Sequence, residues 1–152
     1  MQINELINSI NSIPMQFFMS EDESPKLKKI EERMLDAIKQ QTDLNLKNTK
    51  VEIIDFPGIP KRVNVYLYSK CICKLSDDEL EVNHHGFMTN TTKSRINALL
   101  REFNGSTELV QVNGMWYWKT LSTLSDASLY QWQQIPSHSK PFIFKRTNHV
   151  CT

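Results

Sequence analysis

Glycine is scarce in this sequence, which has only four Gly among its 152 residues. Phosphate-binding loops and dinucleotide-binding turns need closely spaced glycines, because the backbone must approach the bound phosphates. The chain contains neither G-x-G-x-x-G nor G-x-x-x-x-G-K-[ST]. These absences argue against a Gly-rich phosphate loop and against a dinucleotide-binding domain.

Long apolar runs and a dominant charge are absent as well. No stretch approaches the roughly 18 to 20 consecutive apolar residues of a membrane span. Residues 1–18 have no positive charge before their apolar residues, as a secretory signal would. Lys+Arg number 18 and Asp+Glu number 17, so the net charge is only +1. We therefore expect a cytoplasmic protein with no membrane partner, and not a polybasic protein that binds nucleic acid through bulk charge.

Cysteine is rare, and its three copies show no disulfide spacing, which is typical of a reducing compartment. They are Cys71, Cys73 and Cys151, and the chain also holds His84, His85, His138 and His149. Two Cys and two His could form a zinc site, but zinc ligands are usually paired as C-x₂₋₄-C on a tight turn. A C-x-C spacing in a strand instead puts both thiols on one face. We predict structural thiols, no metal site and no cofactor.

The pattern of residues 1–48 indicates an N-terminal helical region. Apolar residues at Ile3, Leu6, Ile7 and Ile10 have helical spacing. Ser24-Pro25 then predicts the start of a second helix, because Ser caps free amides and Pro at the first position loses no hydrogen bond. We expect its charged residues, Glu31 among them, to form an exposed face, and the helix to fade near residues 40–43.

Residues 49–152 have the pattern of an α+β core domain. Strands are predicted at 51–54, over 63–75 as one long or two short strands, from Leu80, and at 142–145. A helix begins at Thr91 or Thr92, and an Asn-Gly turn predicts a hairpin over 109–119. Residues 122–139 have no clear pattern. The connections are too short for crossovers, so we predict antiparallel strands, with one helix inserted between two hairpins.

The segment from His85 to Asn97 (HGFMTNTTKSRIN) is the most distinctive stretch. It resembles a motif, G-[GYW]-x-T-x-T-T-K-x-R-[MI]-N, of small domains encoded by bacteriophages and mobile elements. In those domains a hairpin precedes the motif and a Gly-x-Trp-Tyr strand follows it; here residues 80–83 and 113–117 match. The resemblance covers about Arg62 to Lys119 and implies a viral or mobile-element origin, a host bacterial cell and a β–α–β layout. It implies no mechanism, because that family has no established general activity.

The polar residues of this segment allow two interpretations. The threonines can simply cap the helix, while Asn97 bonds the backbone of a neighbouring strand. Alternatively, free amides, hydroxyls and cations in the first helical turn would form an anion or nucleic-acid site. The candidate residues are Thr89, Thr91, Thr92, Lys93, Arg95 and Arg101. The second interpretation predicts that Lys93→Glu with Arg95→Glu abolishes binding without unfolding the protein.

Aromatic and acidic residues supply further candidates. Trp116 and Trp118 share one strand face, which core packing or base stacking would explain. Trp132 lies in a polar segment, so we expect it to be exposed and to anchor a protein interface. Two acidic stretches are either solvated loops or mimics of nucleic-acid phosphates toward a basic target. They consist of Glu21, Asp22 and Glu23, and of Asp77, Asp78 and Glu79.

We expect no enzymatic activity, because no Ser or Cys nucleophile accompanies a base. The favoured function is a phage or mobile-element accessory protein that binds a host or viral protein, such as an inhibitor of a bacterial defence system in the manner of anti-CRISPR proteins. The alternative is a nucleic-acid-binding accessory protein that uses Lys93, Arg95, Arg101 and the basic residues Lys140, Lys145 and Arg146. Further partners to consider are a nucleoprotein complex and a second copy of the chain.

Overall fold

The computed structural model describes residues 27–124, 127–138 and 140–147. It contains two helices, α2 (Lys29–Gln40) and α3 (Asn90–Phe103). The strands are β1 (Leu44–Leu46), β2 (Thr49–Ile54), β3 (Arg62–Leu67), β4 (Lys70–Leu75), β5 (Glu79–Val82), β6 (Thr107–Val112), β7 (Met115–Leu124), β8 (Ala127–Gln134) and β9 (Phe142–Lys145). The α+β class is confirmed. Neither described helix is long and apolar enough to cross a membrane.

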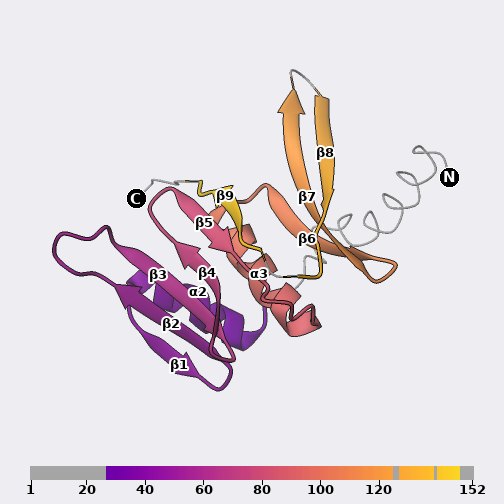
Figure 1. The fold of residues 1–152 in the computed structure, drawn as a ribbon. Helices are drawn as coiled ribbons and strands as arrows, with labels where there is room; N and C mark the ends of the chain where they lie inside the picture. Colours follow the sequence, from indigo (N-terminus) through magenta and orange to yellow (C-terminus); the bar gives the residue numbers. More distant parts are fainter. Residues whose placement is uncertain (1–26, 125–126, 139, 148–152) are drawn as a thin grey trace.

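The strands form two antiparallel sheets, as their short connections predict. One sheet has six strands in the order β1-β2-β3-β4-β5-β9, and the other has three in the order β6-β7-β8. The last strand, β9, pairs with β5. The hairpin of β7 and β8 projects beyond the rest of the fold (Figure 1). Residues 122–139, unassigned from the sequence, therefore contain the end of β7 and all of β8.

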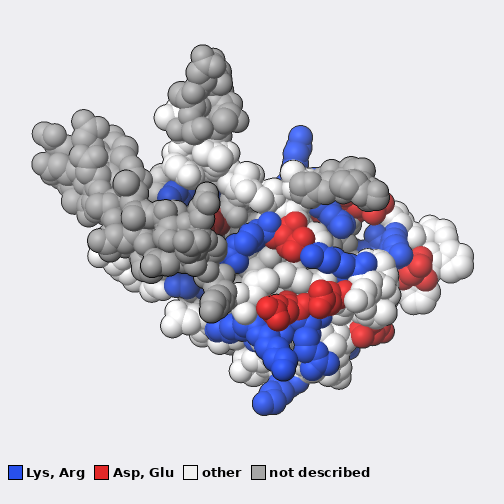
Figure 2. Space-filling view, turned by 180° about the vertical axis from the view of Figure 1, so that it is seen from behind, with Lys and Arg blue, Asp and Glu red and all other residues white. Residues whose placement is uncertain are grey.

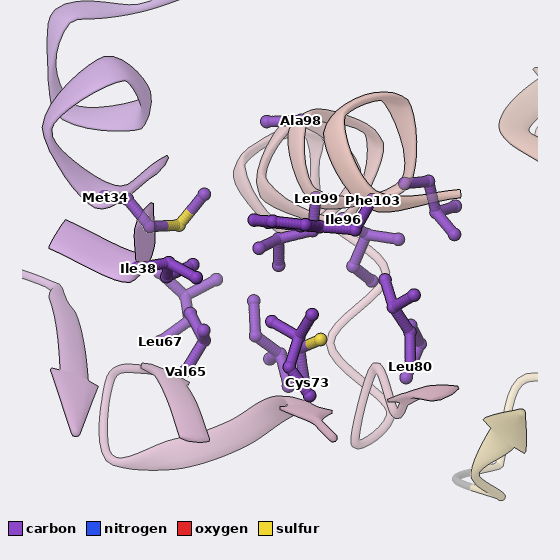
Figure 3. Close-up of a cluster of buried hydrophobic side chains, with 14 of the residues drawn as sticks. Met34, Ile38, Val65, Leu67, Cys73, Leu80, Ile96, Ala98, Leu99 and Phe103 are labelled. Carbon is purple, nitrogen blue, oxygen red and sulfur yellow. The ribbon is translucent and has the colours of Figure 1, made fainter. Parts of the chain in front are cut away.

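Both helices cover one face of the six-stranded sheet and share its core. Met34 and Ile38 of α2 face Leu99 and Phe103 of α3 above the strands, where Val65 points up from below (Figure 3). All five side chains are at most 6% exposed. The helical region at 29–40 and the strands from 49 onward thus bury their apolar faces against each other, which supplies the main hydrophobic stabilisation.

The ends of the helices differ in part from the sequence-based expectation. Ser24 and Pro25 lie outside the described residues, and α2 begins at Lys29, where the Glu31 carboxylate accepts from the Lys28 amide at 3.2 Å. Its end at Gln40 agrees with the prediction. Helix α3 begins at Asn90, and its N-cap is Thr89. The prediction of Thr91 or Thr92 as the cap is therefore wrong by two or three residues. Thr89 is the cap because its extended backbone allows its hydroxyl to accept from the Thr92 amide, at 3.2 Å.

A β-bulge corrects the prediction for Cys71 and Cys73. The register shifts between Val65 and Tyr66, so Cys73 lies opposite Val65 while Cys71 lies opposite Tyr66. Because neighbouring residues of one strand face opposite ways, the extra residue puts the two thiols on opposite faces of the sheet. Cys73 is buried in the core and Cys71 is half-buried.

Ring contacts and hydrogen bonds join the three-stranded sheet to the rest of the described fold. The Trp118 ring of β7 meets the Phe142 and Phe144 rings of β9 edge-on, with centroids 5.2 and 4.8 Å apart. Asn97 of α3 holds the backbone of Leu109 in β6, accepting from its amide at 2.7 Å and donating to its carbonyl at 2.9 Å. The prediction that Asn97 bonds a strand is confirmed, and α3 thereby satisfies the open edge of β6.

We expect Asn97→Ala to lower the free energy of unfolding by about 1–3 kcal/mol, because the Leu109 peptide group loses both partners. Asn90→Ala changes an exposed position of the same helix and should cost less than about 0.5 kcal/mol. Urea unfolding followed by tryptophan fluorescence measures both. Equal effects of the two variants would show that the Asn97 bonds contribute nothing specific.

Candidate functional site

Arg95, predicted to contact an anion, is buried and paired instead. Its guanidinium donates to Glu31 Oε2 at 2.8 Å, and the two side chains are 4% and 3% exposed. Arg95 Nε donates to Thr49 Oγ1 at 3.1 Å, and Ser94 Oγ donates to the same Glu31 oxygen at 2.5 Å. The expected exposure of Glu31 is also wrong, since this carboxylate is the partner that allows Arg95 to be buried. Arg95 therefore offers no charge to an external ligand.

The predicted threonines are engaged in the helix start. Thr89 Oγ1 accepts from the Thr92 amide and lies 3.1 Å from Thr92 Oγ1. Thr92 is buried and Thr91 is half-buried. Because α3 begins at Asn90, Lys93 lies at the fourth helical position and Arg95 at the sixth, beyond the first turn that was predicted for both. The capping interpretation of the threonines is thus confirmed for Thr89.

Lys93 and Arg101 remain near each other on the surface. Both line a shallow pocket of about 200 Å³, together with Glu31 and Glu108. Lys93 Nζ donates to Gln111 Oε1 at 3.2 Å. Burial raises the pKa of Glu108, and the positive charges of Lys119 and Arg101 partly offset this rise. The pocket holds charges of both signs, as does the face of the molecule in Figure 2, where basic and acidic side chains are interspersed.

The acidic candidates are only partly described. Glu21, Asp22 and Glu23 lie outside the described residues. Asp77, Asp78 and Glu79 are exposed around the β4–β5 turn. Arg146, one of the predicted basic contacts, folds onto this turn: its guanidinium donates to the Ser76 carbonyl at 2.8 Å. The same guanidinium lies 5.1 Å from the centre of the Phe103 ring.

The two faces of β7 carry different side chains, although Lys119, on the face away from the tryptophans, is only 5% exposed. Trp116 and Trp118 are each 2% exposed, which confirms core packing and leaves neither ring for base stacking. The alternate residues Tyr117, Lys119 and Leu121 face away from the core, across from Gln134, Trp132 and Tyr130 of β8.

A lysine lies at the centre of that outward face. Lys119 Nζ is 4.2 Å from the ring centre of Tyr130 and 5.2 Å from that of Trp132, which are cation–π distances. Burial lowers the pKa of Lys119, and the charge of Glu108 opposes this shift. Trp132 also meets Tyr117 edge-on, with centroids 6.1 Å apart. Trp132 is therefore half-buried, and the expectation of an exposed ring is wrong because Tyr117 and Lys119 pack against it.

Exposed apolar side chains gather on the projecting hairpin. Leu121 is 38% exposed, and Leu129 and Tyr130 are each 52% exposed. Leu121, Tyr130 and Trp132 share one face of the hairpin, and we call these three residues the hairpin surface; Leu129, next to Tyr130 in the strand, faces the other way. Sequence reasoning missed Leu121, because the predicted hairpin ended at residue 119, and Tyr130, because β8 was not recognised. The aromatic residues at 130 and 132, two apart and followed by polar residues, were the available signal for a strand.

The imidazoles of His84 and His85 both bond backbone groups. His84 is 2% exposed; Nδ1 accepts from the Gly86 amide at 2.9 Å, so the proton lies on Nε2, 3.0 Å from the Pro136 carbonyl. His85 Nε2 bonds the Cys71 carbonyl. Within residues 27–124, 127–138 and 140–147, no three His, Cys, Asp or Glu side chains cluster as metal ligands.

The fold and these contacts define a small α+β domain. A family model described as Kyanoviridae Gp96 protein matches residues 27–145, a range that includes every described helix and strand. The chain belongs to this family, and it is a phage protein, as the resemblance of residues 85–97 predicted. No curated protein and no solved structure matches the chain.

Arg95→Ala should lower the free energy of unfolding by about 3–5 kcal/mol, because it leaves the Glu31 carboxylate buried without its cation. The combined change Arg95→Leu with Glu31→Leu should lower the free energy of unfolding clearly less than Arg95→Leu or Glu31→Leu alone, because it leaves no unpaired buried charge. A loss of this size for Arg95→Ala would also overturn the expectation that Arg95→Glu leaves the fold intact. Guanidinium unfolding measures Arg95→Ala, the double variant and its two single changes, with Lys93→Ala at a half-buried position of the same helix as the control. A loss for Arg95→Ala no larger than that for Lys93→Ala would contradict the assignment.

Stability should fall as the pH drops through about 6.5, the ordinary pKa of histidine. Burial lowers the pKa of His84, with the charges of His85 and His138 acting in the same direction, although the bond to Pro136 opposes them. The unfolded state then binds a proton that the folded state excludes, so acid favours unfolding. His84→Gln should flatten the dependence of the urea midpoint on pH between about 7.5 and 5.5. The exposed control His138→Gln should keep it, and an unchanged slope in His84→Gln would refute the assignment.

Proposed function

We propose that this phage protein acts without catalysis, by binding a protein of the infected cell or of the phage through the hairpin surface. The observation that carries the proposal is the presence of exposed Leu121 and Tyr130, beside Trp132, on one face of a hairpin that projects from the fold (Figure 1). Contiguous apolar patches of this kind mark protein-interaction sites. Aromatic residues such as Tyr130 and Trp132 are enriched among those that dominate binding energy.

Inhibition of a bacterial defence system is the specific form of this proposal. The small size, the near-zero net charge and the family membership support it. The exposed carboxylates Asp77, Asp78 and Glu79 add a surface that can face a basic, nucleic-acid-binding target. The nucleic-acid alternative at the start of α3 has lost its main support, because Arg95 is buried against Glu31.

Affinity capture from infected host cells tests the proposal with three full-length proteins. The wild type should retain a partner, Leu121→Ser with Tyr130→Ser should lose it, and Phe56→Ser should keep it. Phe56 is 60% exposed but lies on the β2–β3 loop, so it controls for the loss of exposed apolar area. With the purified partner, the double variant should weaken binding at least about 30-fold, as loss of a binding hot spot does.

Several results would refute the proposal. One is equal capture by all three proteins, and another is capture that nuclease treatment abolishes. Self-association of the wild type, measured by light scattering and lost in the double variant, would assign the hairpin surface to a second copy of the chain. For the inhibitor role, the wild type but not the double variant should restore plating of a defence-sensitive phage.

A further inference from the structure

A groove lies on the face of the six-stranded sheet that the helices leave open. Thr49 pairs with Leu67, so the β1–β2 turn at 47–48 and the β3–β4 turn at 68–69 meet at one end of the sheet. Between them is a hollow of about 680 Å³. Lys50 and Tyr66 form its floor: they pair across β2 and β3 and point away from the core, whereas their strand neighbours Thr49 and Leu67 are buried.

The groove is basic and its floor is held in place. Lys47 and Lys50 line it, and none of its lining residues is acidic. Lys50 Nζ lies 5.4 Å from the centre of the Tyr66 ring. The Tyr66 hydroxyl donates to Glu52 Oε1 at 3.1 Å, and this bond fixes the orientation of the ring. Glu52 lies two residues after Lys50 in β2. The lining carries two lysines and no carboxylate, and Glu52 beside it accepts from the Tyr66 hydroxyl; this end of the sheet is therefore suited to an anionic ligand.

Tyr68 lies at the rim of the groove, and its backbone has a left-handed conformation that bulky residues rarely adopt. Its φ is +50° and that of Ser69 is +69°, although two-residue hairpin turns with both φ positive strongly favour Asn-Gly. Its ring is nevertheless 67% exposed, so packing does not explain why a bulky residue stands there. The Tyr68 amide donates to the Asn48 carbonyl at 2.9 Å, which ties the two turns together and holds the ring beside the lysines.

We propose that this groove binds single-stranded nucleic acid, with Lys47 and Lys50 contacting phosphates and the Tyr68 ring stacking on a base. A charged backbone with free base faces matches both features, because aromatic rings stack on unpaired bases while lysines follow the phosphates. A duplex hides its base faces within the stack. An acidic peptide would use the lysines but not the exposed ring. The site is separate from the hairpin surface and does not depend on the function proposed for it.

Fluorescence anisotropy with a labelled oligothymidylate of about a dozen nucleotides tests the site. The wild type should bind with an affinity that falls with salt, with a log–log slope of about −1.4 for two phosphate contacts. Lys47→Ala and Lys50→Ala should each weaken binding and make the slope less steep by about 0.7. Lys29→Ala removes the same charge from an exposed position on α2 and should leave both quantities unchanged.

Tyr68→Asn is the sharpest variant, because Asn accepts a positive φ and keeps the turn while removing the ring. We expect a loss of affinity of about fivefold to a hundredfold, the range of one base–aromatic stack, with no fall in melting temperature. The proposal is overturned by an absence of saturable binding at low salt, by wild-type affinity in Tyr68→Asn, or by equal losses in Lys29→Ala. Equally tight binding of a DNA duplex or of polyglutamate would overturn it as well.

Discussion

The ion pair between Arg95 and Glu31 is the constraint around which the main body of the fold is arranged. Removing two charges from water costs several kcal/mol per ion, and only close, fully hydrogen-bonded geometry offsets that cost. Here the partners come from three elements: Glu31 from α2, Arg95 and Ser94 from α3, and Thr49 from β2. The pair tolerates little displacement of either helix, and it therefore fixes how both helices lie on the sheet.

The same contacts explain the polar residues of the segment from His85 to Asn97. Thr89 caps α3, Arg95 pairs with Glu31, and Asn97 closes the edge of β6. Each of these side chains is satisfied within the protein, so the segment works as an internal connector between helix and sheets. The two surfaces that we propose to bind partners lie elsewhere, on the projecting hairpin and at the turns of the large sheet.

The regular parts of this fold could be predicted from the sequence, and the long-range polar contacts could not. Asn113-Gly114 specifies its hairpin locally, and the spacing of Ile96, Leu99 and Phe103 specifies one face of α3. In contrast, nothing near Arg95 in the sequence reveals a partner 64 residues away. The bulge beside Cys71 depends on the register with β3. Strand β8 was missed because its polar residues mask the alternation, and the groove was missed because it joins two separate turns.

The place of β9 in the large sheet has a consequence for the order of assembly during synthesis. Its residues 142–145 pair with 79–82, so β5 has no outer neighbour until about 60 further residues have been translated. Until then a strand edge with unpaired amides is open to other chains. The bonds of Asn104 to the Lys145 carbonyl and of Thr147 to the Phe103 carbonyl then fasten this last segment to the end of α3. The strand that is synthesised after the other strands of the sheet thus covers the open edge of β5.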